Sequence, residues 1–213
     1  MLKGFNKIGF RLDSRLPITL PILDKLISVA PSLVGSPYQI CQFQAMCSLA
    51  FFAFLRIGEM TSSSGRTDNP PLQISHISKL LRSSGDLIAF RTTFGSFKHS
   101  YKARPFSIAV SRQPQSCPVK LLVTYLAMRG PRPGGLFITV DELPVLRSQF
   151  SNQLSSAIQF CCLSLSVYKG HSLRIGAASH ATDKGLSDAQ IRLLGRCKSN
   201  AFFKYVRTPS LCS

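Results

Sequence analysis

Two pairs of charged side chains stand at positions that the hydrophobic pattern of the chain does not require. Arg56 directly follows the most apolar segment, residues 45–55, and Glu59 lies one helical turn further along. His171 and Arg174 have the same spacing at the start of a segment rich in glycine, alanine and serine, so the imidazole and the guanidinium should share one helix face. Each pair alone also fits a structural role, either a polar cap on a buried helix or a solvent-exposed helix end.

Three further side chains extend this set. Lys98 lies in a basic segment, residues 95–104, that joins two predicted strands. Arg196 follows Gly195 in a predicted turn between two helices, and Tyr205 lies on the predicted final helix with basic neighbours. Each of the three also has an ordinary interpretation, as part of a solvated hairpin, as a turn residue or as a half-buried aromatic residue.

Gathered around one phosphate, these side chains could perform phosphodiester chemistry without a metal ion. Arginine binds two nonbridging oxygens with its forked donors, lysine is a compact proton donor, and histidine exchanges a proton near neutral pH. A tyrosine could then be the nucleophile, forming a covalent phosphotyrosyl intermediate that keeps the bond energy.

The composition of the chain favours such a partner and such chemistry. With 26 Lys+Arg against 9 Asp+Glu, the 213 residues carry a formal charge of +17, which attracts polyanions, with nucleic acid as the first candidate and an anionic membrane surface as the second. The few, scattered carboxylates disfavour a two-metal nuclease and a glycosidase, since both need converging acidic groups. We therefore expect no metal ion and no cofactor.

The cysteines and the apolar segments bear on where such a protein works. The seven cysteines form no CxxC pair and have no zinc-ligand spacing, so we expect reduced thiols in an intracellular compartment. The apolar segment at residues 45–55 is shorter than the roughly 20 residues that a membrane-spanning helix needs. We expect it to be a core helix and expect no membrane association.

The local patterns predict a mostly α protein with a small antiparallel β-sheet. We expect residues 1–15 to be a basic lead-in and residues 16–213 to form one domain. Strands are predicted at 87–93 and 105–110, and residues 136–139 fit a short strand or an extended connector. Helices are predicted from Thr19 to Pro31, at 37–55, 118–129, around 150–158, at 171–184 and at 187–194, with a final helix capped by Ser199.

Four segments of the chain resemble the conserved boxes of the tyrosine recombinases, the phage-integrase family. Residues 54–60, FLRIGEM, are similar to the box of the first arginine, and residues 171–174, HSLR, to the His-x-x-Arg box. Residues 194–205, LGRCKSNAFFKY, resemble the terminal box that carries the tyrosine, and residues 95–104 resemble the lysine-bearing β-hairpin. The order and spacing agree over residues 55–207. The terminal box is most similar to recombinases of eukaryotic mobile elements such as DIRS-type retrotransposons and Cryptons.

The resemblance implies the catalytic-domain fold of that family and a role for each residue. Arg56 and Arg174 would clamp the scissile DNA phosphate. Tyr205 would attack the phosphorus to give a 3′-phosphotyrosine, Lys98 would protonate the leaving 5′ oxygen, and His171 would assist proton transfer. Strand exchange would follow when the 5′ hydroxyl of a partner strand reverses the step.

The resemblance also sets expectations about supporting groups and partners. Glu59 would buttress the first box, and Arg196, where most members have His or Trp, would donate a hydrogen bond to a phosphate oxygen in their place. We expect the N-terminal core-binding domain that is usual in the family to be absent from this chain. The implied partners are double-stranded DNA and a homotetramer on paired sites, with no small-molecule cofactor. The implied location is the nucleus in a eukaryote and the cytoplasm otherwise.

Two other functions remain open on the residues alone. Residues 187–207 read as helix, turn and helix, which also describes a DNA-binding helix-turn-helix without catalysis, derived from a decayed mobile element. The charge also fits a basic structural protein of a ribonucleoprotein particle, although most basic residues lie within patterned segments.

Overall fold

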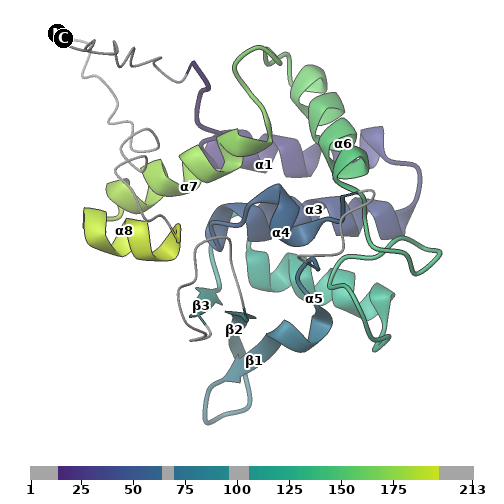
Figure 1. The fold of residues 1–213 in the computed structure, drawn as a ribbon, viewed down its shortest axis with the longest axis vertical. Coiled ribbons are helices and arrows are strands. Elements are labelled where there is room, and N and C mark those ends of the chain that lie inside the picture. Colours follow the sequence, from purple (N-terminus) through teal and green to yellow (C-terminus); the bar gives the residue numbers. More distant parts are fainter. Residues whose placement is uncertain (1–13, 64–69, 96–105, 197–213) are drawn as a thin grey trace, which may run out of the picture.

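The computed structural model describes residues 14–63, 70–95 and 106–196, and it forms a mostly helical fold with one small antiparallel sheet. This confirms the predicted fold class. Helices make up the larger part of the molecule, and the three strands lie together at one end (Figure 1). None of the described helices combines the length and the apolar character that a membrane crossing requires.

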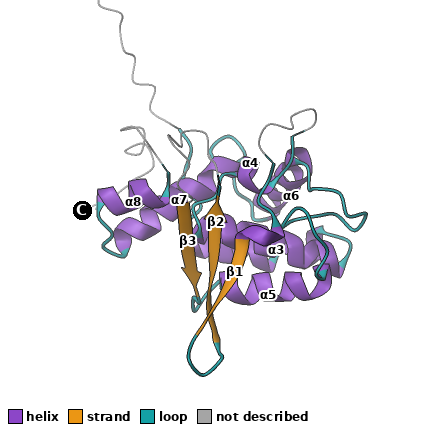
Figure 2. Cartoon of the chain, turned by 60° about the horizontal axis from the view of Figure 1, so that its bottom comes forward, coloured by secondary structure: helices purple, strands orange, loops and turns teal. Residues whose placement is uncertain are grey.

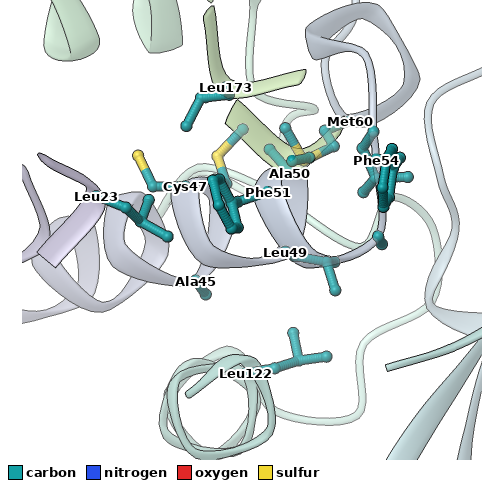
Figure 3. Packing of buried hydrophobic residues seen from close by; sticks show 14 of the residues in the cluster. Leu23, Ala45, Cys47, Leu49, Ala50, Phe51, Phe54, Met60, Leu122 and Leu173 are labelled. Atoms are coloured by element: carbon teal, nitrogen blue, oxygen red, sulfur yellow. The ribbon is translucent and has the colours of Figure 1, made fainter. Parts of the chain in front are cut away.

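Helix α3 (Pro37–Phe52) is the centre of the core. Ser36 caps it by accepting a hydrogen bond from the Gln39 amide, and Pro37 occupies the first turn, where its missing N–H costs nothing. The helix packs against α5 (Pro118–Arg129) and α7 (Gly170–Asp183). Figure 3 shows Leu122 of α5 and Leu173 of α7 on opposite sides of it. Such a helix must be apolar all round, which explains why its sequence has no polar face.

Two predicted helix ends were wrong. The first helical segment does not end at Pro31 but divides into α1 (Leu20–Ser28) and α2 (Ala30–Leu33), because Pro31 is accommodated in the first turn of α2. The long apolar helix ends at Phe52 rather than Leu55. Phe54 then adopts a positive φ of 53°, and the short helix α4 (Ile57–Met60) begins after Arg56. This break carries Arg56 from the core to the surface of the fold.

The sheet has the order β1 (Ile77–Leu81), β2 (Leu87–Phe94) and β3 (Phe106–Ser111), and all neighbours are antiparallel. The two predicted strands are β2 and β3. Strand β1, preceded by the 3-10 turn η1 (Ile74–His76), was not predicted because its exposed residues do not alternate with buried ones. The β1–β2 hairpin extends away from the helices (Figure 2). Residues 136–139 are an extended connector with one isolated bridge, from Ile138 to Pro144.

The C-terminal half of the described chain follows the predicted helices. Helix α6 (Arg147–Phe160) is followed by α7, and the predicted capping box opens α8 (Asp188–Leu194), where the Ser187 amide donates to Gln190 Oε1 over 2.8 Å. The predicted helix after Ser199 lies outside the described residues. Helix α7 lies very close to the segment before α1 at Gly176. A Cβ at this position would lie 1.8 Å from the carbonyl oxygen of Ile18.

Candidate active site

A pocket of about 940 Å³ opens where α4, the end of β2 and the first turns of α6 and α7 meet. Of the described residues that line it, Glu59 is the only acidic one. The basic residues of the lining come from five separate segments and are Arg15, Arg56, His76, Arg147, Lys169, His171 and Arg174. The first turns of two 14-residue helices also lie on its wall, and the positive end of a helix dipole favours anions. The pocket therefore suits a phosphate group.

Arg56 and Glu59 are joined at the start of α4. Glu59 Oε2 accepts from the backbone amide of Arg56 over 2.7 Å, and Glu59 Oε1 accepts from Arg56 Nη1 over 3.1 Å. The Arg56 side chain keeps 38% of its surface exposed, so solvent and a ligand can reach its remaining donors. The contact that the sequence spacing predicts is therefore formed, and it fixes Arg56 at the pocket wall.

Arg174 lies on α7 and lines the pocket from the side of the hydrophobic core. The residue is charged but only 2% exposed. Its guanidinium compensates for this burial by donating to two backbone carbonyls, that of Phe54 over 2.8 Å and that of Gly195. These acceptors come from the segment before α4 and from the end of α8. A buried arginine so held keeps a fixed direction, which preorganises it for an anion.

Arg196 is buried beneath the pocket and is not part of its lining. Its side chain is 1% exposed and donates to Glu59 Oε2 over 2.6 Å and to the Phe54 carbonyl over 3.2 Å. The guanidinium also lies 4.4 Å from the centre of the Phe94 ring. Burial lowers the pKa of Arg196, and the charge of Glu59 acts in the opposite direction.

All five described candidates lie at one place, but only four of them line the pocket. Arg56, Glu59, His171 and Arg174 line the pocket, while Arg196 contacts Glu59 from beneath. The other two candidates, Lys98 and Tyr205, lie outside the described residues.

Sequence reasoning missed the pocket residues Arg15, His76, Arg147 and Lys169. Lys169 directly precedes the first turn of α7, and Arg147 opens α6, so a search for basic residues at predicted helix starts would have found them. Nothing in the local sequence marks Arg15 or His76. Within the described ranges, no group of three His, Cys, Asp or Glu residues is arranged to hold a metal ion.

No family model matches the sequence, and no curated protein is significantly similar to it. Solved structures do match. The XerA recombinase superposes with a TM-score of 0.64 at 18% identity, over 92% of this chain and 60% of that one. The XerH site-specific recombinase bound to its palindromic difH substrate, in a post-cleavage complex, gives 0.69 at 14% identity, over 98% and 53%.

A lambda integrase dimer bound to a COC′ core site gives a TM-score of 0.64 at 16% identity, over 91% of this chain and 48% of that one. The chain therefore spans about half to three fifths of the length of these solved proteins. The mostly helical architecture and its small three-stranded sheet are those of the tyrosine recombinase catalytic-domain fold.

Proposed function

We propose that this chain is the catalytic domain of a site-specific tyrosine recombinase, which breaks and rejoins DNA through a 3′-phosphotyrosyl intermediate. The observation that supports this best is the meeting of Arg56 and Arg174, far apart in sequence, in one basic pocket of a recombinase-type fold. Two guanidinium groups there can bind the nonbridging oxygens of a phosphodiester and stabilise the charge of the transition state.

The remaining roles follow the recombinase boxes. Tyr205 attacks the phosphorus, the 5′ oxygen leaves with a proton from Lys98, and a 3′-phosphotyrosine forms. His171, on the first turn of α7 beside Arg174, assists proton transfer. General acid–base transfer of this kind contributes about 10²–10⁴ in rate, and one charge-stabilising donor about 10²–10³.

The partner in this proposal is double-stranded DNA. A lambda integrase of the same fold has been solved as a tetramer bound to a Holliday junction, and an integrase of the Tn1549 transposon as a complex with circular intermediate DNA. We extend both features to this chain, as a homotetramer on paired sites and as a mobile-element origin of the DIRS or Crypton type. Such an element would place the protein in the nucleus.

The test is capture of a covalent protein–DNA complex. The protein is incubated with a pool of nicked duplexes of randomised sequence, in which the fragment 3′ of the cleavage site diffuses away and traps the intermediate. We expect a denaturant-resistant complex whose released DNA strand carries a free 5′ hydroxyl. Tyr205→Phe should abolish this complex and leave DNA binding intact, whereas Tyr168→Phe, a matched control outside the pocket lining, should still form it.

The same experiment separates the competing functions. DNA binding without any adduct in the whole pool would refute the recombinase and favour the non-catalytic helix-turn-helix protein. Strong salt dependence of binding is expected in both cases, because phosphate contacts release counterions. Selective binding of RNA over DNA would favour the ribonucleoprotein.

A further inference from the structure

Arg196 connects the two arginines of the pocket although it does not line the pocket itself. Its Nη2 donates both to Glu59 Oε2 and to the Phe54 carbonyl. Glu59 is also the carboxylate that holds Arg56, and the Phe54 carbonyl is also an acceptor for Arg174. Arg196 is thus the one guanidinium that shares an acceptor with each of the other two.

The surroundings of Arg196 leave it little freedom to reach a ligand. The side chain is 1% exposed, its Nη1 donates to the Leu194 carbonyl over 3.2 Å, and the Phe94 ring lies against its plane. Moving the guanidinium to a phosphate would break its ion pair with Glu59 and would leave the Phe54 carbonyl with Arg174 as its remaining donor. Breaking a buried ion pair in this way is costly.

The backbone on both sides of these contacts is strained. Phe54 has a φ of 53° and Arg196 a φ of 51°, a region that non-glycine residues seldom occupy and that costs of the order of 1–2 kcal/mol per residue. Such conformations persist where surrounding contacts determine them. Here the Phe54 carbonyl is held by donors from Arg174 and Arg196 together.

We propose that Arg196 is a positioning residue, which holds Glu59 and the Phe54 carbonyl so that Arg56 and Arg174 face the phosphate, and that it does not touch the phosphate itself. This role rests on the proposed function and replaces the expectation that Arg196 donates to a phosphate oxygen. It assigns to this position a buried arginine that acts through its neighbours.

The first test counts phosphate contacts and does not need catalysis. The logarithm of the DNA-binding constant falls with the logarithm of salt concentration by about 0.9 per phosphate contact, so each lost contact reduces the slope by that amount. We measure this slope by fluorescence anisotropy on a nicked duplex. Arg56→Met should reduce the slope by about 0.9, and Arg196→Met should leave it at the wild-type value.

Each result of this test has one meaning. A reduction of the slope in Arg196→Met that adds to the reduction in Arg56→Met when the two changes are combined would show that Arg196 contacts a phosphate itself. It would overturn the positioning role while leaving the recombinase proposal in place. Unchanged slopes in both variants would show that the pocket holds no phosphate and would overturn the proposed function together with the role that rests on it.

The second test asks whether Arg196 acts through Glu59. We compare single-turnover adduct formation at saturating protein for Arg196→Lys, Glu59→Gln and the double variant. Lysine keeps one charge beside Glu59 but lacks the second arm of the guanidinium, which donates to the Leu194 carbonyl. It serves equally if Arg196→Met does not fold. We expect each single change to slow the reaction about 10- to 100-fold, and the double variant to be no slower than the slower single one.

Multiplying effects in this cycle would show that the two residues act independently and would overturn the positioning role. Circular dichroism at the assay temperature confirms that each variant is folded, so loss of structure does not account for a slower rate.

Discussion

Replacing Glu59 by glutamine tests the electrostatic construction of the pocket most directly. Glutamine has nearly the same shape, so packing is preserved, but the charge is lost. The Arg56 pair is 38% exposed on the arginine side and contributes about 0–1 kcal/mol, as solvent-exposed pairs do. The Arg196 pair is different, because its guanidinium is 1% exposed and would keep a buried charge without a carboxylate.

Removing one partner of a buried pair costs about 3–5 kcal/mol. Because Arg196 keeps the Phe54 and Leu194 carbonyls and Glu59 itself is 19% exposed, we expect the low end of that range, a loss of about 3 kcal/mol in the free energy of unfolding for Glu59→Gln. The assay is urea unfolding followed by far-UV circular dichroism. Urea is preferred to guanidinium chloride because it does not screen charges.

Two controls isolate the buried pair. Glu142→Gln makes the same chemical change in the exposed pair with Arg132, whose side chains are 61% and 34% exposed, and should cost about 1 kcal/mol or less. Arg56→Met should cost equally little stability. If Glu59→Gln lost no more than Glu142→Gln, the pair with Arg196 would not stabilise the site, and the reasoning above would be refuted.

Three further changes should be visible in the same unfolding assay. Gly176→Ala should lower the free energy of unfolding by about 1–3 kcal/mol, because the new Cβ clashes with the Ile18 carbonyl. The control Gly35→Ala, whose Cβ meets no atom within 4 Å, should not have this effect. Equal effects would contradict the close approach of α7. Arg129→Met should cost about 3 kcal/mol, since it removes the guanidinium that donates to the Gly135 and Arg132 carbonyls of the loop after α5. A loss below about 1 kcal/mol would show that water replaces this donor. Burial lowers the pKa of His180 from its usual 6.5, so the folded protein binds fewer protons than the unfolded chain, and stability should fall as the pH drops through about 6.5 and below. The stability difference between wild type and His180→Phe should therefore depend on pH, and a constant difference would contradict the shift.

Much of the fold follows from local patterns. The apolar segment that became α3 could lie only in the core, and a charged residue directly after it had to reach the edge of that core. The Ser187 cap and the proline-opened α5 were predictable because capping satisfies backbone groups within one turn. Strand β1 was not predictable, because its residues do not alternate between buried and exposed and its pairing with β2 is what stabilises it.

The sequence by itself determined most of the helices, strands β2 and β3, and the one-turn spacing of Arg56 with Glu59 and of His171 with Arg174, since spacing along a helix sets which side chains share a face. Only the tertiary structure decided that Arg196 is buried against Glu59 instead of lining the pocket. Contacts between distant segments depend on how the helices pack and on which carbonyls a strained turn presents, and no local pattern encodes either.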